Sequence, residues 1–258
     1  MSITEALVLG FIQGLTEFLP ISSSGHLALA NIFMGRNDVE GNLAYILILH
    51  LATLAAVLLY FWRRIVDLIR APGREAAALV VATLPIVVVG VIFGKAITAT
   101  HRMPMLIAVC LAVNGLYLFV ADRLGRGVQP LASAPWWKIL AIGIAQAIRL
   151  PGLSRSGSTI GAGWLCGIDR ADAVRFSFLL SIPAILGASV KDLWDLRHHQ
   201  VDLPLVPIVL GAVTAFGLSL ASIRVVEKLS TRNRFLVFAV YSVAAGLFVA
   251  AWVLTRGR

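Results

Sequence analysis

Two short polar stretches in an otherwise apolar chain carry the residues that could do chemistry. The first follows a Leu-Pro pair and contains a serine triplet, a glycine and a histidine (Leu19 to His26). Glu17 stands just before them, with Gln13 four residues earlier, so these two side chains share one face of a helix. A serine hydroxyl becomes a nucleophile when a base takes its proton, and histidine titrates in the required range. The stretch therefore predicts a carboxylate, a nucleophile at Ser23 and a base at His26.

The second stretch, LPGLSRSGST (Leu150 to Thr159), surrounds an arginine with small and hydroxyl residues. The guanidinium of Arg155 is always charged and matches phosphate oxygens in pairs. Glycine and serine neighbours let backbone N–H groups approach an anion, and the following helix N-terminus adds a favourable dipole. Arg155 is predicted to hold a phosphate; a simpler role, pairing with Glu17, would still bring the two stretches together. The further positions predicted to bind phosphate are Ser22, Ser24, Ser154, Ser156, Gly157 and Thr159.

Together the two stretches offer the groups that phosphoryl transfer uses: a nucleophile, a base, a carboxylate and a phosphate clamp. Such reactions usually need a divalent cation, and Mg²⁺ often takes one or two carboxylates plus substrate phosphates. Glu17 is the predicted carboxylate ligand, and Gln13 offers a neutral oxygen beside it. Arg149 stands close by and either adds a second guanidinium or points towards lipid headgroups.

The composition indicates that the solvent of this protein is lipid. Of its 258 residues, 59% are hydrophobic and 14% are charged, and the mean hydropathy is +0.89, whereas soluble domains carry roughly 25% charged residues. The net charge of +9 does not indicate a nucleic-acid partner, because most basic residues lie in short loops between apolar runs. Cys110 and Cys166 lie in apolar stretches and suggest neither a disulfide framework nor a zinc site. The N-terminus lacks the basic region of a cleaved signal peptide.

The hydropathy pattern predicts an all-α polytopic membrane protein. A spanning helix needs about 20 mostly apolar residues, and six stretches meet this requirement: 43–62, 76–97, 104–121, 173–190, 204–223 and 235–254. Two more segments, 3–33 and 138–168, are apolar but interrupted by the two polar stretches. Irregular backbone is tolerated at membrane depth only where protein or a wet cavity surrounds it. Both segments are therefore predicted to be re-entrant helix–loop–helix hairpins.

The two interrupted segments resemble each other. GFIQGLTEFLPISSSG (Gly10 to Gly25) aligns with GIAQAIRLPGLSRSG (Gly143 to Gly157) with small gaps. Each half, 1–122 and 138–258, then holds one hairpin and three spans within a single membrane domain, 1–258. Because three is odd, the second half enters the membrane upside down, which predicts an inverted-topology repeat with its site at the interface of the halves.

The basic residues suggest an orientation. Loops 63–74, 122–138 and 224–234 lie on one side of this topology and are the more basic, and the positive-inside rule places them in the cytoplasm, with both termini outside. The basic residues of these loops are Arg63, Arg64, Arg70, Arg74, Arg123, Arg126, Lys138, Arg224, Lys228, Arg232 and Arg234. Those of the other side are Arg36, Lys95, Arg102, Lys191, Arg197, Arg256 and Arg258.

The two polar stretches are similar to the signature motifs of the bacterial undecaprenyl-diphosphate phosphatase family, the bacitracin-resistance proteins. QGLTEFLPISSSGH (Gln13 to His26) resembles the first motif, and PGLSRSGST (Pro151 to Thr159) resembles the second. RFSFLLSIPAILGA (Arg175 to Ala188) and the last span, from Phe235, are also similar, so the resemblance covers nearly the whole chain.

The resemblance implies an enzyme of the bacterial inner membrane that hydrolyses undecaprenyl diphosphate to the monophosphate, using Mg²⁺ or Ca²⁺. It also implies six spans plus two re-entrant hairpins, frequent dimers, and a site that opens towards the outer face. The family's acidic pair, serine, histidine and arginine map, in order, onto Gln13, Glu17, Ser23, His26 and Arg155, and positions near its phosphate map onto Ser154 and Thr159. Some members have a second glutamate where this chain has Gln13, which leaves one anionic ligand fewer.

Several alternatives stay open at this point. An inverted repeat with re-entrant hairpins is also a transporter design, so the chain could flip a polyprenyl phosphate. An acid-phosphatase-type lipid phosphatase would need a Lys-x₆-Arg-Pro run, which the sequence lacks. A purely structural scaffold leaves Glu17 and Arg155 without a purpose. Attack by an activated water, in place of Ser23, is also open.

Overall fold

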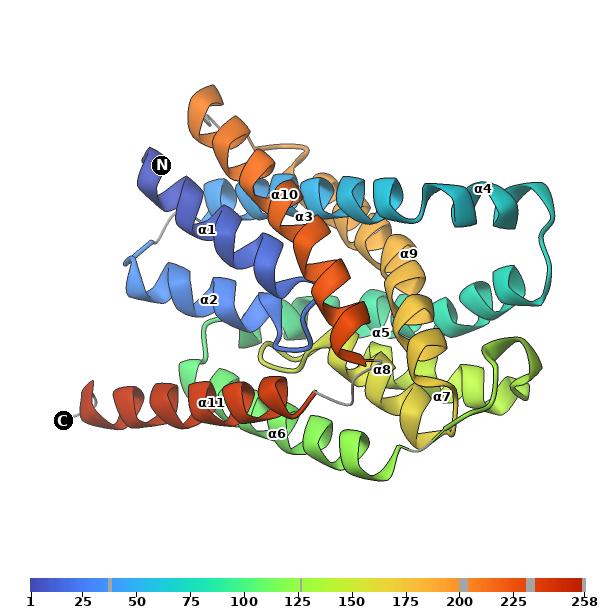
Figure 1. The fold of residues 1–258 in the computed structure, drawn as a ribbon. Coiled ribbons are helices and arrows are strands. Elements are labelled where there is room, and N and C mark those ends of the chain that lie inside the picture. Colours follow the sequence, from blue (N-terminus) through green and yellow to red (C-terminus); the bar gives the residue numbers. More distant parts are fainter. Residues whose placement is uncertain (37–38, 126, 200–203, 231–234, 257–258) are drawn as a thin grey trace.

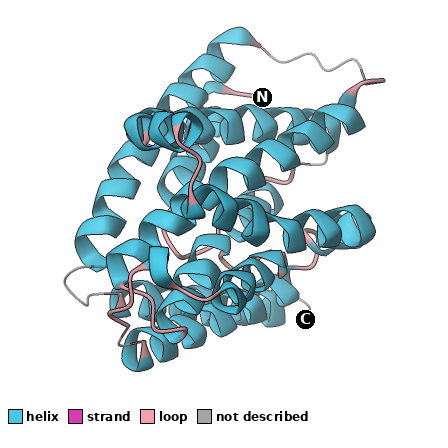
Figure 2. Ribbon diagram, turned by 90° about the vertical axis from the view of Figure 1, so that its right-hand side faces the viewer, coloured by secondary structure: helices cyan, strands magenta, loops and turns pink. Residues whose placement is uncertain are grey.

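The computed structural model is helical throughout most of the described residues, which are 1–36, 39–125, 127–199, 204–230 and 235–256 (Figure 1, Figure 2). One isolated β-bridge, between Gln129 and Ile168, is the only strand-like pairing within these ranges. The elements are α1 (Ile3–Thr16), α2 (Ser23–Phe33), α3 (Val39–Tyr60), α4 (Trp62–Arg70), α5 (Arg74–Thr100), α6 (Pro104–Leu124), η1 (Leu131–Ser133), α7 (Trp136–Ala147), α8 (Arg155–Leu165), α9 (Arg170–Leu196), α10 (Leu205–Ser230) and α11 (Leu236–Arg256).

Six of the described helices are long and apolar enough to cross a membrane, and each overlaps one of the six predicted spans. They are Gly41–Tyr60, Arg74–Thr100, Pro104–Leu124, Arg170–Leu196, Leu205–Ser230 and Leu236–Thr255. The prediction of an all-helical, multi-pass membrane protein is therefore confirmed. The helices α5 and α9 run beyond the predicted spans because polar residues at their ends continue the helix outside the apolar window.

The region predicted as the loop 63–74 contains a helix, α4. The chain leaves α3 at Tyr60, and α4 then runs to Arg70 without a single buried residue. Its sequence, WRRIVDLIR, alternates arginines and apolar residues at the helical period, which suits a helix lying in a membrane surface. A hydropathy window registers only continuous apolar stretches and so misses a helix of this kind.

Polar and apolar side chains are distributed as lipid requires. Val91 and Ile92 of α5 are exposed, whereas Gln13, Asn114 and Gln146 are fully enclosed. A hydrocarbon surrounding cannot satisfy polar groups, so these amides must lie inside the bundle. The interior is therefore the place to look for chemistry.

Small residues allow α1 to lie against α10. A Cβ added to Gly10 would come within 2.5 Å of the carbonyl oxygen of Gly211, and one added to Gly14 within 2.5 Å of that of Ala215. The hydroxyl of Ser222 donates a hydrogen bond to the carbonyl of Gly14 at 3.1 Å. Small residues and hydroxyls are the usual means by which membrane helices approach closely. This contact fixes the first hairpin against the last third of the chain.

Both interrupted segments fold as two helices joined by a loop. Figure 1 shows α1 and α2 one above the other on the left, joined by a loop at their inner end. The helices α7 and α8 also pack together, and α7 lies against α5 where Gly143 meets the backbone of Ala82. The two loops, 17–22 and 148–154, carry or adjoin the polar residues singled out in the sequence.

Candidate active site

The first loop is held in an unusual backbone conformation. Ser22 has φ 73°, the one positive value at a non-glycine residue in the described chain. Its hydroxyl accepts a hydrogen bond from the backbone N–H of Gly25 at 3.3 Å and so caps α2. Positive φ at such a residue costs on the order of 1–3 kcal/mol and persists only where other contacts impose it. Such strain is concentrated at functional sites, and the residues that follow are Ser23 and Ser24.

The second loop supplies that constraint. Gly152 has φ 102°, and its backbone N–H donates to the Ser22 hydroxyl at 3.0 Å. The hydroxyl of Ser156 donates to the carbonyl of Leu19 at 3.1 Å. Ser154 caps α8 by accepting from the backbone N–H of Gly157 at 3.1 Å. The tips of the two loops, far apart in sequence, therefore form one hydrogen-bonded unit.

Replacing Gly25 by alanine is expected to separate the loops. The added Cβ would lie 2.8 Å from the backbone nitrogen of Gly152, where no side chain can move aside. Overpacking of this kind costs roughly 1–3 kcal/mol, so the melting temperature in detergent should fall. Gly90→Ala is the control, because nothing lies within 4 Å of its Cβ position. Equal melting temperatures for the two variants would contradict the close contact.

Asn114, in the middle of α6, ties both loops to the bundle. Its amide nitrogen donates to the carbonyl of Pro20 at 2.9 Å and to the hydroxyl of Ser242 at 3.2 Å. Its amide oxygen accepts from the backbone N–H of Ser154 at 3.0 Å. Asn114 was not predicted from the sequence, although a lone amide within an apolar span is a usable signal.

Glu17 and Arg155 form an ion pair where the loops meet. The Arg155 Nη2 atom lies 2.7 Å from the Glu17 Oε1 atom, and the side chains are 13% and 7% exposed. The guanidinium also donates to the carbonyl of Ser177 on α9 at 3.4 Å. Unpaired charges are costly in such surroundings, so each side chain stabilises the other. The expected proximity of these two residues is found.

The second oxygen of the Glu17 carboxylate serves two more predicted residues. Ser23 donates its hydroxyl proton to Glu17 Oε2 at 2.6 Å, and Gln13 donates an amide N–H to the same oxygen at 3.1 Å. The amide oxygen of Gln13 is buried without a hydrogen-bond partner. The unpaired amide oxygen of Gln13 and the neighbouring Glu17 carboxylate are oxygen ligands of the kind that a hard cation prefers.

His26 does not contact Ser23 in this arrangement. Its Nδ1 atom lies 2.7 Å from the carbonyl oxygen of Ser22, so Nδ1 carries a proton. Its Nε2 atom lies 2.8 Å from the hydroxyl of Tyr241, whose ring stacks on the imidazole. The proton acceptor next to Ser23 is therefore Glu17, and Tyr241 is a neighbour that the sequence did not reveal.

The other hydroxyls of the site already have partners. Thr159 pairs with the Ser177 hydroxyl at 2.6 Å, and Ser154 lies 3.0 Å from the Ser156 hydroxyl. Ser24 has one long contact, 3.4 Å, to the hydroxyl of Ser22. These bonds hold the loops in shape around Glu17 and Arg155.

More charges surround the pair. His50 of α3 and Arg149 of the second loop both interact electrostatically with Glu17 and Arg155. Asp192 of α9 interacts with His50 and Arg149 in turn. Arg149 as a residue is exposed, and its guanidinium is near enough to Glu17 and Arg155 to act on both. His50 lies in the middle of an apolar span and Asp192 just beyond the predicted span 173–190. Neither was predicted, because a single polar residue of this kind belongs to no motif.

Comparison with known proteins places this arrangement in a family. A family model described as "Bacitracin resistance protein BacA" matches residues 6–248. The chain is 40% identical to the undecaprenyl-diphosphatase of Moorella thermoacetica over 99% of this chain and 100% of that protein. It is 40% identical to that of Desulforudis audaxviator over 98% of each chain, and 35% identical to that of Methanococcus maripaludis over 95% and 98%. The chain belongs to the bacitracin resistance protein BacA family.

Proposed function

We propose that this protein hydrolyses undecaprenyl diphosphate to undecaprenyl phosphate and inorganic phosphate. The observation that carries the proposal is the enclosed Glu17–Arg155 pair, with the Ser23 hydroxyl on the same carboxylate. Similarity over the full length to proteins named undecaprenyl-diphosphatase supports the same substrate. The lipid-facing helices around the site suit a substrate whose long prenyl tail stays in the membrane.

Arg155 is the proposed clamp for the terminal phosphate. A guanidinium has five N–H donors, and its contacts to Glu17 and Ser177 leave others free for phosphate oxygens. Arg149 is the proposed second guanidinium, since a diphosphate carries charge on both phosphoryl groups. The loop positions proposed to shape the phosphate site are Ser22, Ser24, Ser154, Ser156, Gly157 and Thr159.

Ser23 is the proposed nucleophile. Its oxygen attacks the terminal phosphorus, the bond from that phosphorus to the bridging oxygen breaks, and the prenyl monophosphate leaves with the electron pair. The Oε2 atom of Glu17 accepts the serine proton and gives it back to the serine oxygen when the phosphoserine is cleaved. The Oε1 atom would be free for a cation once the substrate draws Arg155 towards phosphate. Water then cleaves the phosphoserine and releases phosphate, with His26 as the proposed base. Direct attack by water on the diphosphate is the competing route.

Glu17 and Gln13 are the proposed protein ligands of Mg²⁺ or Ca²⁺. The unpartnered amide oxygen of Gln13 beside the carboxylate supports this pair. No cluster of three or more His, Cys, Asp or Glu side chains occurs in the described part of the chain. The remaining ligands would be water and substrate oxygens, a common arrangement for Mg²⁺. The bound cation would neutralise charge on the diphosphate.

The two helix–loop–helix segments are proposed to be re-entrant hairpins of an inverted repeat with halves 1–122 and 138–258. The packing supports this, because exchanging the halves exchanges the contacts: α1 lies against α10, and α7 lies against α5. The pair α6–α11 maps onto itself in the same way. The membrane is proposed to be the bacterial inner membrane, with the site open to the outer face and homodimers as in the family.

A phosphate-release assay tests the function. Purified protein in detergent is expected to release phosphate from C55 diphosphate. This release should stop when EDTA is added and should resume with excess Mg²⁺. Detergent removes the two compartments that transport needs, so release under these conditions separates hydrolysis from flipping. If no divalent cation supports phosphate release, the proposed function is refuted. Full activity in EDTA would refute the proposed metal site at Glu17 and Gln13 and leave the proposed hydrolysis standing.

A further inference from the structure

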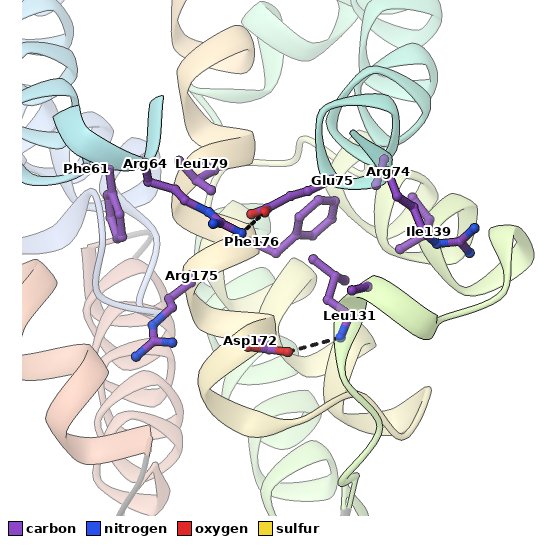
Figure 3. Close-up of a pocket in the computed structure, with 12 residues that line it drawn as sticks. Phe61, Arg64, Arg74, Glu75, Leu131, Ile139, Asp172, Arg175, Phe176 and Leu179 are labelled. Carbon is purple, nitrogen blue, oxygen red and sulfur yellow. Dashed lines mark hydrogen bonds and ion pairs between the residues drawn. The ribbon is translucent and has the colours of Figure 1, made fainter. Parts of the chain in front are cut away.

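A cavity of about 420 Å³ lies outside the candidate active site, between α4, α5 and α9 (Figure 3). It opens beside α4 and the start of α5, on the side of the protein that carries the basic loops 63–74 and 122–138. Its walls combine aromatic and charged side chains, among them Phe61, Phe176, Arg64, Glu75, Asp172 and Arg175.

Aromatic rings separate this cavity from the catalytic groups. Phe18, next to Glu17 in the chain, meets the ring of Phe178 at 5.5 Å, and Phe178 meets that of Phe61 at 6.3 Å. Phe61 lines the cavity. The cavity shares no lining residue with the candidate active site, so its ligand need not be the substrate of that site.

The cavity has an excess of positive charge. Both of its carboxylates are already engaged: Glu75 pairs with Arg64, and Asp172 accepts the backbone N–H of Leu131 at 3.0 Å. Arg175 has only a 3.6 Å contact with Glu227, and its side chain is 60% exposed. Figure 3 shows Arg64 and Arg175 on the same side of the cavity as Phe61. In Figure 3 the Arg64 guanidinium points to Glu75, and that of Arg175 lies below Phe61. The Arg175 N–H groups thus remain available beside the apolar lining residues Phe61, Phe176 and Leu179.

The neighbouring helix α4 extends this surface beyond the bundle. In Figure 1 it projects beyond the bundle at the upper right. Trp62 and Ile69 are exposed on it, beside Arg63 and Arg70. Basic helices with exposed apolar residues lie among lipid headgroups, where each arginine is attracted by anionic lipid.

We propose that this cavity binds the phosphate headgroup of an anionic membrane phospholipid. The phosphate contacts the guanidinium groups of Arg64 and Arg175, and the apolar part of the lipid lies along Phe61 and the apolar side of α4. The apolar floor favours a lipid over free phosphate, which would leave that surface uncovered.

Native mass spectrometry of the detergent-purified full chain tests the proposal, with phosphatidylglycerol, phosphatidylcholine and inorganic phosphate as probes. Phosphatidylglycerol is expected to bind preferentially, and Arg64→Gln and Arg175→Gln are each expected to weaken it roughly fivefold. The control is Arg123→Gln, whose guanidinium lies over Phe119 outside the cavity and whose loss should change nothing. Phosphate release from C55 diphosphate should stay at the wild-type rate in all three variants.

Three outcomes would overturn the site. Equal binding of phosphatidylglycerol and phosphatidylcholine would show that the cavity does not select an anionic headgroup. An equal loss of lipid affinity in all three variants would show that binding depends on the overall surface charge and not on this cavity. Binding of inorganic phosphate that Arg175→Gln abolishes shows a free-ion site. Arg64→Gln leaves Glu75 unpaired, so if that variant does not fold, Arg175→Gln decides alone.

Discussion

Replacing Arg155 with alanine is expected to lower kcat/KM for C55 diphosphate by roughly 10³-fold or more. The Arg155 guanidinium lies 2.7 Å from the Glu17 carboxylate, so a charged hydrogen-bond donor is already in place within the site. Its loss removes the phosphate clamp and leaves a carboxylate that is 7% exposed without its counter-charge. The measurement is phosphate release at saturating Mg²⁺.

Because the loss of the guanidinium also leaves Glu17 unpaired and thereby destabilises the protein, Arg155→Lys is the companion variant. Lysine keeps the charge opposite Glu17 but cannot bind two phosphate oxygens as a planar fork. We expect it to melt near the wild type and still lose roughly 10²-fold in kcat/KM. Arg123→Ala, an exposed arginine elsewhere, is the control. Wild-type turnover in Arg155→Lys would mean that the guanidinium only holds the loops together.

Ser23→Ala is expected to have a comparable effect if the serine attacks phosphorus. Loss of a nucleophile usually costs at least about 10³-fold in kcat, since only the slower attack by water remains. Rapid acid quenching with β-³²P-labelled substrate, which carries the label in the terminal phosphate, should trap a phosphoserine in the wild type and none in the variant. Ser133→Ala is the control, because its hydroxyl donates to the carbonyl of Pro130, outside the site.

The same experiment separates the two proposed bases. Ser23 donates to Glu17, whereas His26 is bonded to Ser22 and Tyr241, so His26→Ala should still form the phosphoserine and accumulate it. A Ser23→Ala enzyme with more than about a tenth of wild-type kcat, and no trapped label in either protein, would establish direct attack by water.

The sequence predicted the six spans because each is a continuous apolar run, and lipid imposes that composition on any helix that crosses it. It also predicted that Glu17 and Arg155 would meet, although 138 residues separate them, since each charge in an apolar segment needs a partner. The helix α4 was missed because its arginines interrupt the apolar run.

The neighbours of the site could not be predicted in the same way. Ser177 of α9 accepts a hydrogen bond from Arg155, and Tyr241 of α11 is hydrogen-bonded to His26. Such contacts depend on how helices rotate and cross, which no local pattern records. The geometry likewise puts the Ser23 hydroxyl on Glu17, where chemical type alone favoured His26 as its partner.

The contact between α1 and α10 has a consequence for how the protein is made. Gly14 and Ser222, which join these helices, are 208 residues apart in the chain. At roughly 5–20 residues per second, a ribosome needs about 10–40 s to supply the second after the first. Arg155 is made 138 residues after Glu17, so the N-terminal helix–loop–helix segment has a carboxylate without its guanidinium for about 7–28 s. Its packing surface on α10 follows only later. A carboxylate without its counter-charge is costly to place in hydrocarbon. We therefore expect the segment to enter the membrane only after Arg155 has been made.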